Sequence, residues 1–305
     1  MPLQAREPEA ACGMPAPRIL ILGSNGGLGR ALVRQLAPNH EVTAWTRAEL
    51  DFDQPETIAS KLAGCEFDVL LNPAGMTNPD ACEAQPEKAR VANVLGPQVL
   101  AQCCHERGAR LIHFSTDYVF SGEPDVLWGE DDRTDPVNLY GRTKREGEMA
   151  VLQASSDALV ARVSWLFGPD KPSHPDQMIE RALKGAELTA VADKTSAPTS
   201  TQDVCEWIEC LMQKSASGVL HLCNSGMASW HSWAEQTLTL AETLGIPVQT
   251  ARVRPIKLAE LTQLKAARPL STVMSNQRLQ SFLDIEIRHW SAALEDYLGR
   301  KYQPR

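Results

Sequence analysis

The sequence predicts an α/β protein built on a doubly wound parallel sheet, with a smaller mixed lobe attached. Three observations support this. A short apolar run at residues 18–22 leads directly into the glycine-rich segment 23–29, and apolar residues at helical spacing follow. Further apolar runs of strand length recur along the chain, with helical patterns between them. The chain also has 305 residues, which suits one large α/β unit with an appended lobe.

Composition excludes several classes of function. Hydrophobic residues make up 43% and charged residues 22%, which is ordinary for a soluble globular protein. The formal net charge of -8 argues against a nucleic acid or an anionic membrane as partner. No apolar run approaches the ~20 residues of a transmembrane helix. Residues 1–17 are polar and acidic without the apolar centre of a signal peptide, so we expect a disordered leader.

The cysteine pattern favours a cytoplasmic protein with reduced thiols. The chain has eight cysteines but no Cys-x-x-Cys pair, and the adjacent Cys103 and Cys104 fall in a helical pattern. No His, Cys or Asp cluster has the spacing of metal ligands, so no metal site is expected.

The glycine-rich segment lies between a predicted buried strand and a predicted helix, which is the order that a dinucleotide site requires. Gly23 permits the tight turn, Gly26 lets the backbone approach a pyrophosphate, and Gly29 lets helix and strand pack closely. The N-terminus of the helix then offers free N–H groups to the phosphates. We therefore expect a Rossmann-type domain over residues 18–168, completed by residues 199–223; the alternative is a structural glycine turn. The cofactor contacts expected here are Gly23, Asn25, Gly26, Gly27, Leu28 and Gly29.

The second strand, residues 41–45, bears on the choice of cofactor. Sites that prefer NAD usually end this strand with an acid that holds the ribose 2′-hydroxyl. Thr46 and Arg47 stand there instead, and an arginine can pair with a 2′-phosphate with no carboxylate to repel it. NADPH is therefore the expected cofactor, with NADH as the alternative. Asp51 follows a little later, where adenine, ribose or a helix end are equal candidates as its partner.

The third and fourth strands, residues 67–71 and 111–114, end in segments suited to contact a ligand. Pro73, Ala74 and Gly75 follow the third strand and would let a cofactor lie across its end. A helix is expected from about residue 86 to 106. His113 in the fourth strand is expected to be packed rather than catalytic. The strand runs into residues 115–120, whose hydroxyl groups would meet a ligand at the carboxyl edge of the sheet.

Tyr140 and Lys144 stand four residues apart, so on a helix their side chains share one face. A free tyrosine has a pKa of about 10 and is a poor acid–base catalyst at neutral pH. A nearby ammonium favours the phenolate, so we expect Lys144 to lower the pKa of Tyr140. The pair could then pass a proton to an oxygen that gains negative charge.

These motifs together resemble the extended short-chain dehydrogenase/reductases and, within them, the dTDP-4-dehydrorhamnose reductases. The resemblance runs from about residue 18 to residue 300. It is carried by the spaced glycines and by residues 115–120, 136–144 and 147–148. Further segments that share it are Glu130 and Asp132, Arg162-Val163-Ser164-Trp165, Ala197-Pro198-Thr199 and Ala267-Arg268-Pro269.

The resemblance implies a role for each matching residue. Tyr140 would be the proton donor, and Lys144 would activate it and hold the nicotinamide ribose. Thr116 would be the catalytic hydroxyl that hydrogen-bonds the substrate oxygen, and Ser115 would contact the cofactor. Asp117, Tyr118 and Trp165 would bind the substrate. The implied reaction is NAD(P)H-dependent reduction of the C4 carbonyl of a nucleotide-linked 4-keto-6-deoxy sugar.

The chain departs from the family pattern at two places. Many members carry Asn-Phe where this chain has Ser173 and His174, which leaves the exact sugar and base open. Some members bind magnesium at a dimer contact through an acid after the third glycine. Ala31 occupies that position here, so no such metal is expected; a homodimer stays open.

Residues 169–305 are expected to form mainly the substrate-binding lobe. Helices are expected at 177–184, at 204–212, from Trp230 onward and near 290–298, and strands at 188–192, 219–222 and 248–253. Two alternative functions remain. One is a related sugar-nucleotide reductase or epimerase. The other is a non-catalytic regulatory subunit, because the β subunit of methionine adenosyltransferase resembles the same family.

Overall fold

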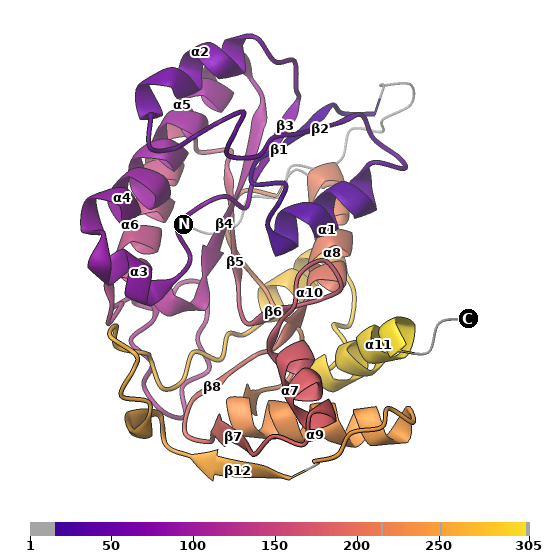
Figure 1. The fold of residues 1–305 in the computed structure, drawn as a ribbon. Coiled ribbons are helices and arrows are strands. Elements are labelled where there is room, and N and C mark those ends of the chain that lie inside the picture. The colour runs from indigo at the N-terminus through magenta and orange to yellow at the C-terminus, as the bar shows by residue number, and fades with distance from the viewer. Residues whose placement is uncertain (1–15, 215, 251, 303–305) are drawn as a thin grey trace.

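The computed structural model describes residues 16–214, 216–250 and 252–302 (Figure 1). The leader expected for residues 1–17 lies outside these residues, apart from its last two positions.

A six-stranded parallel sheet forms the larger unit, in the order β10-β5-β4-β3-β1-β2. The chain goes from β1 to β2 at one edge and then crosses back to β3 on the other side of β1. This reversal places a crevice at the carboxyl ends of β1 and β3, where doubly wound sheets bind their ligands. The strands are β1 Ile19–Ile21, β2 Val42–Ala44, β3 Val69–Asn72, β4 Arg110–Thr116, β5 Leu159–Val163 and β10 Gly218–Leu222.

Helices cover both faces of this sheet, as Figure 1 shows. One apolar core lies under α1, α8 and α10, and the other lies under α2, α5 and α6. The residues of β1 and β3 and most of those in β4 and β5 are buried, which explains why these inner strands appear in the sequence as largely apolar runs. The helices of this unit are α1 Gly27–Leu36, α2 Ile58–Ala63, α3 Pro79–Ala84, α4 Pro86–Arg90, α5 Gly96–Arg107, α6 Leu139–Ala154, α8 Thr201–Gln213 and α10 Gln277–Leu283.

The helix expected from residue 86 to 106 is interrupted by a π turn at Val91–Leu95. Asn93 in this turn is fully buried, and its amide bonds the backbone N–H and C=O of Met76 at 2.9 and 3.0 Å. Its Nδ2 also donates to Thr143 Oγ1 at 3.0 Å. The interruption therefore ties the segment after β3 to helix α6, and both of these line the site described below.

The smaller lobe is built from short strand pairs and three helices, which confirms the expected mixed architecture. The parallel pairs are β6 Leu166–Phe167 with β9 Thr199–Ser200 and β7 Leu188–Val191 with β12 Val253–Ile256; β8 Thr195–Ser196 is antiparallel to β11 Ala228–Ser229. The helices are α7 His174–Leu183, α9 Trp230–Thr243 and α11 Trp290–Tyr302. Short 3-10 turns lie at Pro55–Thr57, Asp117–Val119 and Leu258–Glu260.

The strand expected at 248–253 is wrong, because β12 begins only at Val253. The backbone N–H of Gln249 donates to the carbonyl of Ala182, and its side chain donates to the carbonyl of Leu183, at 3.0 and 2.9 Å. Gln249 therefore serves the end of helix α7, so its N–H is not free for a strand partner.

Candidate active site

A cleft of about 1180 Å³ runs along the carboxyl edge of the sheet, and the lobe forms its opposite wall. All but one of the residues predicted from the sequence line it. These are Gly23, Asn25, Gly26, Gly27, Leu28, Gly29, Arg47, Asp51, Pro73, Ala74, Gly75, Ser115, Thr116, Asp117, Tyr118, Tyr140, Lys144 and Trp165. Thr46 does not, because its N–H and hydroxyl both donate to Glu49, at 2.7 and 2.6 Å.

The glycine turn leaves room for an anion at the start of α1. Gly23 has a φ of 59°, and a Cβ on Gly29 would lie only 2.2 Å from the carbonyl oxygen of Gly23. No side chain caps the helix at Gly26, and its first turn carries no acid. The free N–H groups and the positive end of the dipole therefore face the cleft, as a pyrophosphate would require.

Arg47 is not free of carboxylates, which corrects the expectation from the sequence. Its Nε lies 3.1 Å from Asp51, and its Nη2 lies 2.5 Å from Asp53. Both acids stand within six residues of Arg47 on the loop after β2, so the sequence already showed that they are close to it along the chain. A 2′-phosphate at this place would share the guanidinium with two carboxylates.

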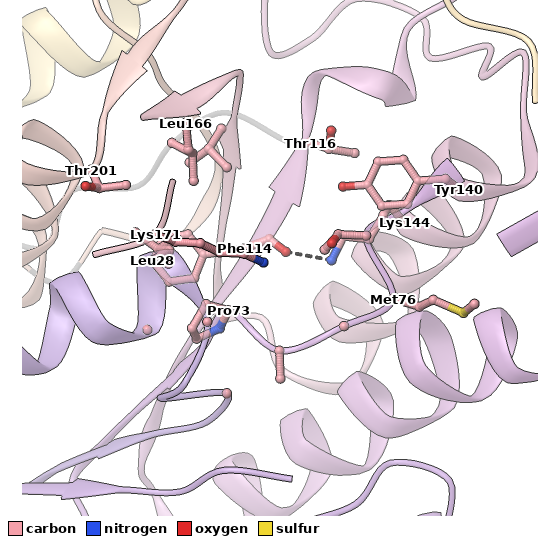
Figure 2. A pocket seen from close by; sticks show the side chains of 18 of the residues that line it. Leu28, Pro73, Met76, Phe114, Thr116, Tyr140, Lys144, Leu166, Lys171 and Thr201 are labelled. Carbon is pink, nitrogen blue, oxygen red and sulfur yellow. Dashed lines mark hydrogen bonds between the residues drawn. The ribbon is translucent and has the colours of Figure 1, made fainter. Parts of the chain in front are cut away.

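Helix α6 positions the catalytic candidates. Asn138 caps it by accepting the Gly141 N–H at 2.8 Å. A Cβ on Gly141 would lie 2.1 Å from the carbonyl oxygen of Tyr118, so glycine is needed for the helix to approach the segment after β4. The Tyr140 ring consequently lies edge-on to Tyr118, with centroids 5.6 Å apart. Figure 2 shows Tyr140 and Lys144 on one side of the cavity and Leu28, Leu166, Lys171 and Thr201 on the other.

Burial controls the protonation of the Tyr140–Lys144 pair. It raises the pKa of Tyr140, and the Thr116 hydroxyl opposes this only in part. It lowers the pKa of Lys144 to about 8. The amine of Lys144 donates to the carbonyl of Phe114 at 2.7 Å. The expectation that Lys144 lowers the pKa of Tyr140 is therefore wrong in this structure: removing the phenol from water has the larger effect.

Thr116 and Asp117 form a buried hydroxyl–carboxylate centre beside Tyr140. Thr116 Oγ1 donates to Asp117 Oδ1 at 3.0 Å and accepts the Tyr118 N–H at 3.2 Å. The other oxygen of Asp117 accepts three further hydroxyl groups. These belong to Ser164, Ser196 and Thr272, at 3.2, 3.0 and 2.5 Å. Asp117 thus orients Thr116 and joins it to the lobe.

Aromatic rings of the lobe form one end of the cleft. Trp165 has a φ of 39°, which is costly for a bulky residue, and such strain concentrates at ligand sites. Its ring stacks on Trp233 at 5.7 Å and lies 5.9 Å from Trp230. From the sequence we expected Trp230 and Trp233 to begin a helix but did not assign them to the site. Their spacing of three residues already indicated that both side chains share one face of that helix.

Lys171 is a further lining residue that sequence reasoning did not assign to the site, and His174, which stands where the chain departs from the family pattern at 173–174, lines it as well. His174 Nε2 donates to the carbonyl of Trp230 at 3.2 Å, and burial lowers the pKa of this histidine to about 4, so it is neutral. Lys171 lies over the glycine turn, with its Cβ 3.3 Å from where a Cβ on Gly27 would be. No sequence motif marks Lys171; the approach of its loop to α1 is a tertiary contact.

Two further features bear on the class of protein. No group of three or more potential metal-ligating side chains comes together within the part of the chain that the structure describes. Among the same residues, no helix has both the length and the apolar character needed to cross a membrane.

The comparison with known families decides the relationship of the chain. A family model described as the RmlD substrate binding domain matches residues 17–303. The chain belongs to this family. Membership of the RmlD family places it among NAD(P)H-dependent oxidoreductases like the dTDP-4-dehydrorhamnose reductases.

Individual members of the RmlD family match over nearly their whole length. A dTDP-4-dehydrorhamnose reductase from Mycolicibacterium smegmatis is 37% identical, over 92% of this chain and 85% of the relative. A probable dTDP-4,6-dihydroxy-2-methyloxan-3-one 4-ketoreductase from Streptomyces antibioticus is 36% identical, over 94% of this chain and 98% of the relative. The solved dTDP-4-dehydrorhamnose reductase from Bacillus anthracis, in complex with NADP, has a TM-score of 0.88 at 26% identity, covering 94% of this chain and 100% of that one.

Proposed function

We propose that the protein reduces the C4 carbonyl of a nucleotide-linked 4-keto-6-deoxy sugar, with NADPH as the hydride donor. The observation that carries this proposal is the convergence of Thr116, Tyr140 and Lys144 on a cleft that also contains the uncapped glycine turn. The names of the relatives support the substrate class, and the NADP in the Bacillus anthracis structure supports the cofactor. We also propose that residues 18–168 and 199–223 form the cofactor-binding unit.

The cofactor fits the residues present. The turn from Gly23 to Gly29 would hold its pyrophosphate, and Pro73, Ala74 and Gly75 would let it lie across the end of β3. Lys144 is placed to hold the nicotinamide ribose. When bound, the cofactor supplies a hydride to the carbonyl carbon.

The protein's own residues manage the charge on the carbonyl oxygen. Tyr140 is protonated at neutral pH, because its ordinary pKa is about 10 and burial raises it further, so its hydroxyl still carries the proton that the oxygen needs. The Thr116 hydroxyl, whose one proton is donated to Asp117 in this structure, would turn that proton to the carbonyl oxygen, and one such donor contributes about 2–4 kcal/mol to transition-state stabilisation. Asp117 holds Thr116 in place. Trp165 and its aromatic neighbours would form the wall against which the sugar nucleotide packs.

A direct test is NADPH oxidation in the presence of a panel of nucleotide-linked 4-keto-6-deoxy sugars. We expect turnover with at least one sugar and reduction at C4, identified by NMR of the product. An epimerase would change the sugar without net oxidation of NADPH. Absence of turnover across the panel, together with co-purification with a synthetase, would instead support the regulatory-subunit alternative.

Arg47 provides a prediction about the cofactor. NADPH should bind more tightly than NADH, because only NADPH carries the 2′-phosphate that a guanidinium can pair with. Arg47→Ala should reduce the ratio of NADPH affinity to NADH affinity by up to about fivefold, which is the scale of one solvent-exposed ion pair. Asp53→Asn should increase this affinity ratio, since the substitution removes a carboxylate that competes with the 2′-phosphate for Arg47. Calorimetry with both cofactors is the measurement, and equal affinities in the unmutated protein would contradict the prediction.

A further inference from the structure

A buried polar chain lies directly behind Lys144 and is not used in the mechanism above. Asn72 ends strand β3, and His113 stands opposite it in strand β4. Both side chains are fully buried. Asn72 Nδ2 lies 3.0 Å from His113 Nδ1, and His113 Nε2 lies 3.3 Å from Lys144 Nζ. The chain therefore runs from β3 through β4 to the amine on α6.

The backbone fixes the direction of the hydrogen bonds in this chain. The N–H of Ala74 donates to Asn72 Oδ1 at 3.2 Å, so Nδ2 is the atom that faces His113. An amide nitrogen only donates, so His113 Nδ1 must accept. Burial, and next the charge of Lys144, hold the pKa of His113 well below its usual value, so the ring is neutral. A neutral ring that accepts at Nδ1 carries its single proton on Nε2.

Lys144 consequently faces an N–H and not a lone pair. The ammonium form has only donors and would meet a second donor at Nε2, whereas a neutral amine can accept the Nε2–H. Among the residues that the structure describes, the acceptor that bonds the Lys144 amine is the Phe114 carbonyl, at 2.7 Å. The tautomer imposed by Asn72 thus favours the neutral amine.

We propose that Asn72 and His113 are positioning residues for Lys144: they present an N–H to its amine and so set the pH range over which that amine holds its proton. This inference rests on the proposed function only in its effect on turnover. The titration of Lys144 itself is independent of the substrate. A purely structural role for the pair would affect stability without moving that titration.

Other titratable groups also face Lys144. Burial is the largest effect on its pKa and lowers it, while Glu148 on the same helix and Cys82 on α3 raise it. Glu148 is itself held by Arg162 and Arg145. None of these groups lies in the Asn72–His113 chain, so a change at Asn72 leaves their contributions in place.

The test uses Asn72→Asp in the full-length protein. The new carboxylate would keep the Ala74 N–H and require a proton on His113 Nδ1, which leaves a lone pair at Nε2 for the Lys144 ammonium. The titration midpoint of Lys144 should rise by about 1 pH unit, the scale of one gained hydrogen bond to a charged group. Competitive labelling with acetic anhydride over a range of pH, read by mass spectrometry of the peptide containing Lys144, measures this midpoint.

Repeating the Asn72→Asp substitution in a protein without His113 separates the effect of the His113 tautomer on Lys144 from the effect of the added negative charge. In a protein that already carries His113→Phe, the Asn72→Asp change can act on Lys144 only through its charge. The rise in the Lys144 titration midpoint should then be less than half of the rise seen with His113 present. His113→Leu replaces that background if the phenylalanine variant does not fold by circular dichroism. An unchanged midpoint in Asn72→Asp, or an equal rise with and without His113, would overturn the proposal. Because the labelling needs no substrate, these outcomes are distinct from a failure of the proposed reductase function.

Discussion

Tyr140→Phe should lower the turnover of the 4-keto sugar by roughly 10²–10⁴-fold, the contribution of a positioned general acid. The substitution keeps the ring and its edge-on contact with Tyr118 and removes only the hydroxyl. That hydroxyl lies beside Thr116 and carries its proton at neutral pH, since burial raises a pKa that is ordinarily about 10. Steady-state NADPH oxidation gives the turnover, and calorimetry gives the cofactor affinity. The affinity should barely change, because the phosphates are held at the glycine turn.

Tyr297→Phe is the matched control for the loss of a phenol. Tyr297 lies on α11, donates to Asp176 at 2.5 Å and is not itself among the residues that line the cleft. Its variant should keep normal turnover. Lys144→Ala should differ from both, since it should lose turnover and part of the cofactor affinity. A Tyr140→Phe protein that reduces the sugar as fast as the parent would require another proton donor.

Glu148→Ala should destabilise the protein by about 3–5 kcal/mol, because it leaves the Arg162 charge buried and unpaired. Glu148 and Arg162 are both fully buried and form a bidentate pair with two N–O distances of 2.8 Å. Denaturant unfolding of parent and variant gives the difference. Glu146→Ala is the control on the same helix, since Glu146 pairs with Arg90 at the surface and should contribute at most about 1 kcal/mol.

The effect of Glu148 should also depend on pH. Burial alone would raise the pKa of Glu148, but Arg162 outweighs it and the pKa lies below its ordinary value. A carboxyl group whose pKa is lowered in the folded state stabilises the protein at pH values above its unfolded-state pKa of about 4. That contribution is lost as the pH falls through the folded pKa. Parent and variant should therefore converge in strong acid; a gap that stays constant there would contradict the ion-pair explanation.

The double substitution Glu148→Leu with Arg162→Met identifies the cause. It removes both charges and should recover most of the lost stability, because hydrophobic residues often replace a buried pair without penalty. If the double variant were as unstable as Glu148→Ala, lost packing rather than an unpaired charge would explain the effect.

Much of the fold could be predicted because its signals are local. The run at 18–22, the glycine turn and the Tyr140–Lys144 spacing each specify an element from neighbouring residues alone. Gln249 shows the limit: it resembles a strand residue, and only its bonds to the end of α7 exclude it from one. Trp230 and Trp233 likewise reach the site through packing against Trp165, some 65 positions earlier in the chain.

The pKa of Tyr140 could not be predicted for the same reason. The sequence places a lysine one turn away, which argues for a lower value, but the sign depends on how much water the fold excludes. The same holds for Arg47, where the spacing to Asp51 and Asp53 was visible but the side-chain directions were not.

The hydroxyl groups gathered around Asp117 have a consequence for the order in which the protein is made. The carboxylate takes a hydrogen bond from Thr272, which lies 155 positions later in the chain. A nascent chain on the ribosome can form the glycine turn and the first strands early. It cannot complete the hydrogen bonds around Asp117, which orients Thr116, until residue 272 has emerged. The proposed catalytic centre would therefore be among the last parts to be completed, since a chain that ends before residue 272 lacks one of the hydroxyl groups that bond Asp117.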